Sequence, residues 1–278
     1  ADGNGKGGTV SRNFSVGIER VFEKELAGTP GERTYEISAD GVRIPVAKEE
    51  QRLAVDGKNI RLTINRDVQY FAQQVVRARA EELKAEWCTA IVMDVRDGSI
   101  LALADSSTMD PGAAMTPRAI SQNVEPGSTE KMLTSSALIE QGLTTPTSVY
   151  DVPATLTIDG QTFKDAFEHG AQRRTFSGII HDSMNTGEEQ GLIADWRDWD
   201  GRQQYTVLFG QGVAQTPLQT AMIFQALGNK GVRLKPRIVD AIIDADGTEH
   251  KRAVEPGERM VSEETAASCL TLMENVVE

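Results

Sequence analysis

The sequence is poor in positive charge. Its 278 residues hold 29 Lys and Arg against 41 Asp and Glu, which gives a formal net charge of −12. Nucleic-acid binding depends on clustered basic side chains that neutralise phosphates. The acidic balance therefore argues against a nucleic-acid partner. Long apolar runs are also missing, and no stretch approaches the length of about 18 apolar residues that a transmembrane helix needs.

Cysteine is scarce, with only two residues in the sequence. Cys88 and Cys269 lie too far apart in sequence for a metal-ligand pair. We expect two buried free thiols, although a disulfide stays open because an exported location would permit one. The chain begins without a methionine or a signal peptide. We therefore expect a piece of a longer protein whose anchor or export signal lies upstream.

Apolar spacing predicts a mixture of helices and strands. Helices are expected at 17–26, 67–86, 128–139, 175–181, 216–227 and 262–278. Strands are expected at 60–64, 89–95, 99–104, 239–243 and 251–254, with a hairpin at 34–46, short strands in 144–161 and a strand-to-loop passage at 205–212. The polar residues 51–57 indicate a candidate domain boundary, and residues 105–127 are expected to form a loop. The apolar runs within 89–104 predict a hairpin that is buried on both faces. This mixture indicates α+β or α/β layers.

The stretch Glu125-Pro126-Gly127-Ser128-Thr129-Glu130-Lys131 joins a Pro-Gly turn to a helical pattern. Ser128 stands where an N-cap or first-turn residue would stand. Lys131 follows three residues later, so one helical turn brings both side chains to the same face. By itself, the same spacing also fits a serine that only caps the helix, followed by an exposed lysine in the first turn.

Ser-x-x-Lys can form a complete nucleophile and base. A serine hydroxyl attacks poorly until a base removes its proton, and a buried lysine can be that base because desolvation disfavours the ammonium form. The start of a helix adds positive potential that favours a developing oxyanion. The same motif, together with Ser-Asp-Asn and Lys-Thr-Gly elements, occurs in penicillin-binding proteins and class A β-lactamases.

Several stretches resemble one family in one order. They are Gly28–Gly31, Leu62–Asn65 with Gln69, Gly98–Ala104, Arg118–Ile120, Glu125–Lys131, Ser183-Met184-Asn185, Phe209–Gly212, Thr216–Gln219 and Gly231-Val232. Together they resemble the class B penicillin-binding proteins, and we expect the cell-division type. The resemblance implies an α+β, β-lactamase-like transpeptidase fold with an antiparallel central sheet flanked by helices.

The resemblance also implies roles. The catalytic groups would be Ser128 as nucleophile, Lys131 as base, Ser183 as proton relay and Asn185 as hydrogen-bond partner of Lys131 and of the substrate amide. The substrate-binding neighbours would be Gly127, Thr129, Met184 and Thr186. A simpler interpretation stays open, in which Ser183 caps a helix and Asn185-Thr186-Gly187 is a plain turn. His169 and His181 are interpreted as ordinary polar residues, and Glu168, Glu188 and Glu189 as parts of solvated faces.

At the level of the whole protein, the resemblance implies a serine D,D-transpeptidase that cross-links peptidoglycan stem peptides and is a target of β-lactams. Residues 1–57 would be the remnant of an N-terminal module and 58–278 the transpeptidase domain. A membrane glycan polymerase and division proteins are expected partners, at the extracytoplasmic face of an anchoring membrane. No metal or cofactor is expected. Alternatives are a non-catalytic penicillin-binding sensor or divisome scaffold domain, and an inactive interaction module.

Three departures qualify the resemblance. No lysine is followed by Thr-Gly or Ser-Gly, and residues 186–208 are fewer than the family usually has between its corresponding motifs. We therefore expect the printed sequence to join segments of a longer chain, with omissions near Gly187 and after Glu278 and another join near 8–15. Glu130 replaces an aromatic or apolar residue and is expected near the mouth of the site.

Overall fold

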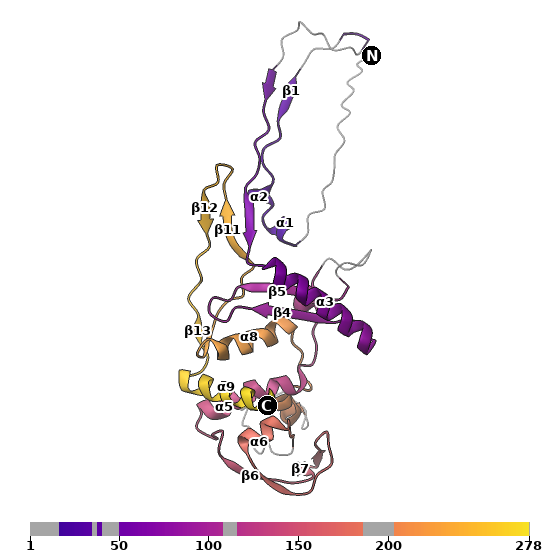
Figure 1. Ribbon diagram of the computed structural model, residues 1–278, viewed down its shortest axis with the longest axis vertical. Helices are drawn as coiled ribbons and strands as arrows, with labels where there is room; N and C mark the ends of the chain where they lie inside the picture. Colours follow the sequence, from indigo (N-terminus) through magenta and orange to yellow (C-terminus); the bar gives the residue numbers. More distant parts are fainter. Residues whose placement is uncertain (1–16, 35–37, 41–49, 108–115, 186–202, 278) are drawn as a thin grey trace. The chain divides into compact units, whose positions relative to one another are not determined.

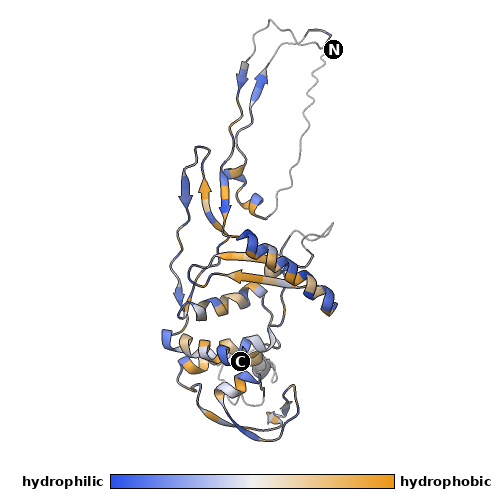
Figure 2. Cartoon of the chain, in the orientation of Figure 1, coloured by the Kyte–Doolittle hydropathy of each residue, from blue (hydrophilic) through white to orange (hydrophobic). Residues whose placement is uncertain are grey.

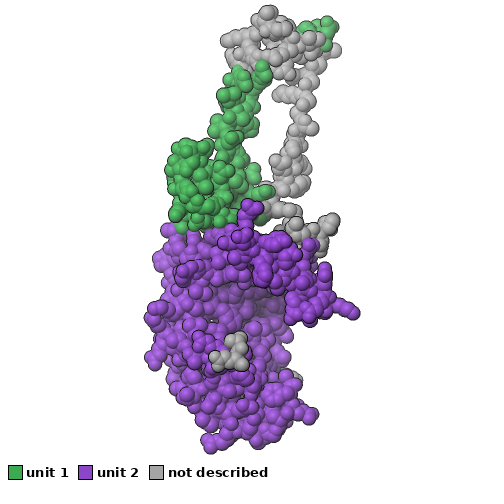
Figure 3. All heavy atoms as spheres, in the orientation of Figure 1, with its two compact units in different colours: residues 1–62, 239–252 green, residues 63–238, 253–278 purple. Residues whose placement is uncertain are grey.

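The computed structural model of the chain describes residues 17–34, 38–40, 50–107, 116–185 and 203–277 (Figure 1). Apolar residues run along strands β4 (Thr89–Met93) and β5 (Ile100–Asp105), whereas helix α3 (Arg66–Leu83) carries both polar and apolar residues (Figure 2). Two compact units are distinguished by their internal contacts (Figure 3). Unit 1 comprises residues 1–62 and 239–252, and unit 2 comprises residues 63–238 and 253–278.

Unit 1 consists mainly of antiparallel strands. Its elements are α1 (Gly17–Val21), α2 (Glu23–Leu26), β1 (Glu32–Thr34), β2 (Glu50–Arg52), β3 (Asn59–Leu62), β11 (Val239–Ile243) and β12 (Glu249–Lys251). Strands β1 and β2 pair, and the other three form a sheet in the order β12-β11-β3. Arg61 of β3 reaches Asp240 of β11 at 2.8 Å and Glu249 of β12 at 2.6 Å. These pairs fix the register of the strands more than they add to stability, because all three side chains are partly exposed.

Unit 2 begins with a layer of one helix on two strands. Asn65 caps α3 by accepting hydrogen bonds from the backbone N–H groups of Asp67 and Val68. The helix packs on the antiparallel β4–β5 pair through a small core of Ala72, Val76, Ala102 and Ala104. Gln69 adds a backbone-like link, donating to the Leu103 carbonyl at 3.1 Å and accepting from the Leu103 N–H at 2.7 Å.

The remainder of unit 2 is a helical block with small hairpins. Its elements are α4 (Arg118–Ser121), η1 (Gly127–Glu130), α5 (Lys131–Glu140), β6 (Val149–Val152), β7 (Leu156–Ile158), β8 (Gln161–Phe163), β9 (Gln172–Thr175), α6 (Phe176–His181), α7 (Gln203–Thr206), η2 (Val207–Phe209), α8 (Pro217–Gly228), β10 (Val232–Arg233), β13 (Glu258–Arg259) and α9 (Glu263–Val277). Strands pair antiparallel as β6–β9, β7–β8 and β10–β13.

One apolar core joins helices α5, α6, α8 and α9. It contains Met132, Phe176, Ile180, Leu227, Val261, Ala266, Cys269 and Leu272, all buried. Helix α8 contacts β4 on one side and α9 on another, so it connects this core to the β4–β5 layer (Figure 1). A neighbouring cluster of Val152, Ile179 and Met184 extends the packing to the end of α6. Helix α6 therefore packs against both apolar clusters, through Phe176 and Ile180 on one and Ile179 on the other.

Several sequence predictions are confirmed. Thr216 forms a capping box with Gln219, and Pro217 occupies the first turn of α8. Ser262 caps α9 by accepting from the N–H of Thr265 at 3.1 Å. Both cysteines are free thiols as expected, but only Cys269 is buried and Cys88 is half-buried. Burial raises the pKa of Cys269 to about 11.

Among the described residues, no helix combines the length and the apolarity that a membrane crossing requires.

Other predictions about local structure are wrong. Residues 205–209 are helical rather than extended, because a short apolar run has no period that separates strand from helix, and the Leu208 carbonyl is held by the Thr134 hydroxyl at 2.7 Å. The expected loop at 105–127 contains α4. Strand β4 is not buried on both faces, since Val92 is 36% exposed. Most of the expected hairpin at 34–46 lies outside the described residues.

We predict that α9 is needed for the stability of the helical block. Leu272 is completely buried in the shared core, so Leu272→Ala should lower the free energy of unfolding by about 2–5 kcal/mol. Leu270→Ala is the matched control on the same helix, where the side chain is 39% exposed, and should cost about 1 kcal/mol or less. Urea unfolding of both variants measures the difference, and equal losses would contradict this account of the core.

Candidate functional site

Ser128 lies in the one-turn helix η1, immediately before α5 begins at Lys131. The side chain of Ser128 is exposed, whereas Lys131 is only 2% exposed. Gly127 has a φ of +58° and donates its N–H to the Gly210 carbonyl at 3.0 Å. A Cβ atom on Gly210 would lie 2.2 Å from the Gly127 carbonyl oxygen, so this close approach requires glycine. The two backbones thus hold the turn that presents Ser128.

The Lys131 amine is surrounded by oxygen atoms from one short segment. Its Nζ atom donates to the carbonyl of Ser183 at 2.8 Å, to the carbonyl of Met184 at 3.0 Å and to Oδ1 of Asn185 at 2.9 Å. The Ser183 hydroxyl is also within reach, at 3.4 Å. An ammonium group has three N–H donors and no acceptor, and these oxygens match it. The structure therefore brings together three of the four predicted catalytic residues.

The segment reaches Lys131 because α6 ends in a Schellman turn. The N–H of Ser183 bonds to the Ile180 carbonyl at 3.1 Å, and the N–H of Met184 bonds to the Ile179 carbonyl at 3.0 Å. Ser183 has a φ of +52°, in the left-handed region that non-glycine residues rarely adopt. This turn points the two successive carbonyls of Ser183 and Met184 at the amine. The left-handed backbone at Ser183 thus places local strain at the predicted site.

Asn185 is held at both its backbone and its side chain. Its backbone N–H donates to Oδ1 of Asp165, and its Nδ2 donates to the Lys164 carbonyl at 3.2 Å. The remaining side-chain oxygen accepts from Lys131. The hydrogen bond between Asn185 and Lys131 has the form expected from the sequence. Asp165 and Lys164 come directly after β8, and no sequence pattern singled them out.

His169 is not an ordinary surface residue. Its side chain is 9% exposed, and its Nε2 bonds to Oδ2 of the fully buried Asp165 at 2.6 Å. Its Nδ1 bonds to the Gly170 carbonyl at 2.8 Å. Both contacts raise the pKa of His169, and the hydrogen bond to the Gly170 carbonyl has the larger effect. His181, by contrast, is half exposed and bonds to its neighbour Asp182, as a polar surface residue does.

Ser128 and Lys131 are joined through the backbone of η1, because the Lys131 backbone N–H donates to the Ser128 carbonyl. The Lys131 amine bonds to the 183–185 segment. The neighbouring Thr129 is exposed and donates its hydroxyl hydrogen to the Pro126 carbonyl at 2.7 Å. The Met184 side chain is completely buried, so its backbone carbonyl is what it offers to the site. Thr186 lies outside the described residues.

Glu130 does not lie at the mouth of the site as expected. It is 7% exposed, and its Oε2 accepts a hydrogen bond from Nε2 of Gln215 at 3.1 Å. Burial raises the pKa of this carboxyl, and the Gln215 contact opposes the rise. The expectation was wrong because the side chain that follows Thr129 turns inward, toward the segment of Gln215 that pairs with Val124.

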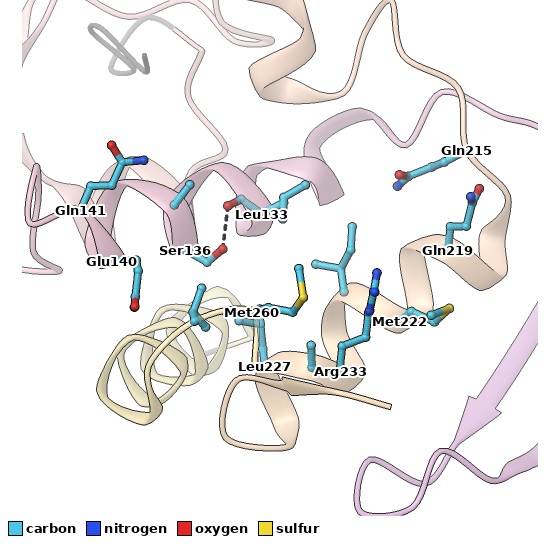
Figure 4. A pocket seen from close by; sticks show the side chains of 14 residues that line it. Leu133, Ser136, Glu140, Gln141, Gln215, Gln219, Met222, Leu227, Arg233 and Met260 are labelled. Atoms are coloured by element: carbon cyan, nitrogen blue, oxygen red, sulfur yellow. Dashed lines mark hydrogen bonds between the residues drawn. The ribbon is translucent and has the colours of Figure 1, made fainter. Parts of the chain in front are cut away.

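A groove beside α5 is separate from the Lys131 cluster. It has a volume of about 680 Å³ and lies between α5, α8 and the Met260-Val261 segment (Figure 4). Leu133, Met222 and Met260 supply much of its apolar wall, and none of Lys131, Ser183 and Asn185 lines it. Within the described residues, no group of three or more His, Cys, Asp or Glu side chains could hold a metal ion.

Comparison with known proteins gives one consistent family. The family model described as "Penicillin binding protein transpeptidase domain" matches residues 88–190 and 178–278. The penicillin-binding protein PbpB of Mycolicibacterium smegmatis is 32% identical, over 95% of this chain and 47% of the relative. The peptidoglycan D,D-transpeptidase FtsI of Escherichia coli K12 is 25% identical, over 94% of this chain and 48% of the relative. The chain therefore spans about half the length of the curated relatives it matches.

Comparison with solved structures indicates the same family. A peptidoglycan synthetase from Bifidobacterium adolescentis superposes with a TM-score of 0.78 at 32% identity, over 94% of this chain and 54% of that one. Penicillin-binding protein 3 from Mycobacterium tuberculosis, solved in complex with aztreonam, superposes with a TM-score of 0.75 at 27% identity, over 91% of this chain and 67% of that one. The α+β transpeptidase fold expected from the sequence is confirmed by these neighbours together with the helices and antiparallel pairs described above.

We predict that the left-handed backbone at Ser183 costs stability. Ser183→Gly and Ser183→Ala both remove the hydroxyl, but only glycine adopts this φ without strain. The glycine variant should be more stable than the alanine variant by about 1 kcal/mol. At Ser177, inside helix α6, the order should reverse, because glycine there is less favourable than alanine by about 1 kcal/mol. Thermal unfolding of the four variants tests both orders, and alanine exceeding glycine at Ser183 would contradict the turn.

Glu130 should make stability depend on pH. The pKa of Glu130 is raised in the folded state, so folding favours the protonated carboxyl. The protein therefore loses stability as the pH rises above 4.5, the ordinary pKa of this carboxyl. Glu130→Gln removes this titration while keeping the shape. The variant should match the wild type near about pH 4 and be the more stable of the two near about pH 8. Denaturant unfolding at both pH values checks the sign, and a constant difference would argue against a buried carboxyl.

Proposed function

The chain belongs to the penicillin-binding protein transpeptidase family, and on that premise we propose that it acts as the acyl-transfer part of a peptidoglycan D,D-transpeptidase. The observation that carries the proposal is the buried Lys131 amine, one helical turn from an exposed Ser128 and bonded to Ser183 and Asn185. All four residues belong to the matched part of the chain. The activity and substrates proposed here are those of the whole protein.

The first half-reaction would form an acyl-enzyme. The Ser128 oxygen attacks the carbonyl carbon of the penultimate D-Ala of a stem peptide, and its proton passes to a neutral Lys131 amine. The Ser128 backbone N–H faces the developing oxyanion at the start of the helical turn. When the C–N bond breaks, the terminal D-Ala leaves with a proton relayed from Lys131 through the Ser183 hydroxyl. Ser128 is then an ester and Lys131 a neutral amine.

The second half-reaction would complete the cross-link. The amine of a second stem peptide attacks the ester carbonyl and loses a proton to Lys131, a peptide bond forms and the Ser128 hydroxyl is restored. Lys131 must therefore be neutral at the start of each attack. The three oxygens at 2.8, 3.0 and 2.9 Å suit the ammonium form, so one of these contacts must be given up when the proton leaves. Asn185 is the side chain best placed to release it and turn to the substrate.

β-Lactams would react at the same serine. Their strained amide presents a carbonyl to the nucleophile just as the D-Ala-D-Ala bond does, and ring opening leaves no departing amine to make room for an acceptor. The structural neighbour from Mycobacterium tuberculosis has been solved with aztreonam and with ampicillin. We propose that this chain is likewise acylated by β-lactams on Ser128 and that the adduct hydrolyses very slowly.

The cellular setting is proposed from the similarity to FtsI and PbpB. The protein would serve cell division at the extracytoplasmic face of the membrane, tethered by an N-terminal helix, with a membrane glycan polymerase and division proteins as partners. Residues 1–57 would be what this chain holds of an N-terminal module, and 58–278 would be the transpeptidase portion. Gly127, Thr129, Met184 and Thr186 would border the substrate.

We predict a single covalent adduct with benzylpenicillin on the full-length protein. Intact mass spectrometry should show one added drug mass on the wild type and none on Ser128→Ala, because the exposed Ser128 hydroxyl is the proposed nucleophile, one helical turn from the lysine. Ser136→Ala is the control. Ser136 lies on α5, the helix that follows Ser128, and its hydroxyl donates to the Leu133 carbonyl at 2.7 Å, so this variant should leave the adduct intact. An adduct that survives Ser128→Ala would exclude the proposed nucleophile. Acylation without cross-linking of stem peptides would favour the sensor or scaffold alternative.

A further inference from the structure

The carboxylate of Asp165 is completely buried, directly behind the predicted site. One of its oxygens accepts the backbone N–H of Asn185, and the other is bonded to Nε2 of His169 at 2.6 Å. A buried carboxylate is costly unless it is paired and hydrogen-bonded, and here both kinds of partner are present. The contact with Asn185 connects this pair to Lys131 through a single residue.

The His169 ring supplies the opposite charge. Its Nδ1 faces the Gly170 carbonyl at 2.8 Å, and a carbonyl can only accept, so Nδ1 carries a hydrogen. Its Nε2 faces a carboxylate oxygen, which is satisfied when Nε2 also carries a hydrogen. A ring that donates from both nitrogens is an imidazolium, and these same two contacts raise the pKa of His169. The geometry of these contacts therefore fits an ion pair between His169 and Asp165.

The segment that carries Asp165 is fixed to the same body as Lys131. Phe163, at the end of β8, is 7% exposed and packs edge-to-face on Phe209 of η2, with ring centroids 6.2 Å apart. The preceding residue of η2, Leu208, accepts the hydrogen bond from Thr134 on α5. Residues 164 and 165 then hold Asn185 at two points, its side-chain Nδ2 and its backbone N–H.

We propose that Asp165 and His169 are positioning residues of the acyl-transfer site: their buried ion pair fixes the backbone of Asn185 and thereby aims the Asn185 side chain at Lys131. The inference rests on the proposed function and adds two residues to it. Asp165 is linked to Lys131 through Asn185. The pair acts through Asn185, and its protonation state is therefore coupled to the geometry around the lysine.

The charged surroundings of His169 determine the sign of the pH effect. Asp165 raises the pKa of the imidazole and Arg174 of β9 lowers it, while Arg174 is itself bonded to Asp182 at 3.0 Å. The net pKa lies above the ordinary value of 6.5. The ion pair is complete below that ordinary value and is lost as pH rises through the raised one. At higher pH the clamp on Asn185 weakens.

The experiment is the pH profile of acylation by benzylpenicillin, measured as a second-order rate constant on the full-length protein. For the wild type we expect a bell whose alkaline side falls as His169 loses its proton. His169→Gln donates an N–H at every pH, so the alkaline fall should disappear. Asp165→Asn should slow acylation by about 10- to 100-fold at the optimum, since small misplacements of reacting groups have effects of this size.

His250→Gln is the matched control. His250 forms the same kind of pair with Asp244, also at 2.6 Å, but in unit 1, and it should leave the bell unchanged. If His169→Gln proves unstable by thermal unfolding, His169→Lys keeps a cation to about pH 10 and should move the alkaline fall upward. A bell of unchanged shape and rate in the folded His169 variant overturns the inference and leaves the proposed function standing. A wild type that benzylpenicillin never acylates removes both.

Discussion

The burial of one charged amine dominates the arrangement of unit 2. Lys131 is 2% exposed, and an isolated ammonium in such a place would be very unfavourable. The chain answers with two carbonyls and an amide oxygen from residues 183–185, which the left-handed Ser183 turns toward the amine. Every other feature of the candidate site follows from that requirement: the end of α6, the burial of Met184 and the clamp on Asn185.

The stored strain and the buried charge form one arrangement. A Schellman turn normally places glycine in the left-handed position, but serine stands there and brings a hydroxyl to 3.4 Å from the amine. The completely buried Asp165 carboxylate accepts the backbone N–H of Asn185 and is balanced by His169.

The sequence predicted the parts of the site that depend on local spacing. Ser128 and Lys131 are three residues apart, and one helical turn relates them whatever the rest of the chain does. Thr216 and Pro217 predicted the start of α8 for the same reason, since a cap acts on its own helix. The strand prediction failed at residues 205–209 because so short and mostly apolar a run has no distinctive period. The segment is helical, and the Thr134 hydroxyl of α5 bonds to its Leu208 carbonyl.

Order along the chain and local chemistry were thus determined by the sequence alone: the Ser-x-x-Lys motif, the Ser-Met-Asn element, the helix starts and an acidic balance that argues against nucleic acid. The tertiary structure decided which groups meet. Asn185 lies 54 residues from Lys131 and 20 from Asp165, so no spacing rule relates them. Glu130 turned inward and His169 became half of a buried pair for the same physical reason. Burial and pairing are set by what packs around a side chain, and that is decided only when distant segments come together.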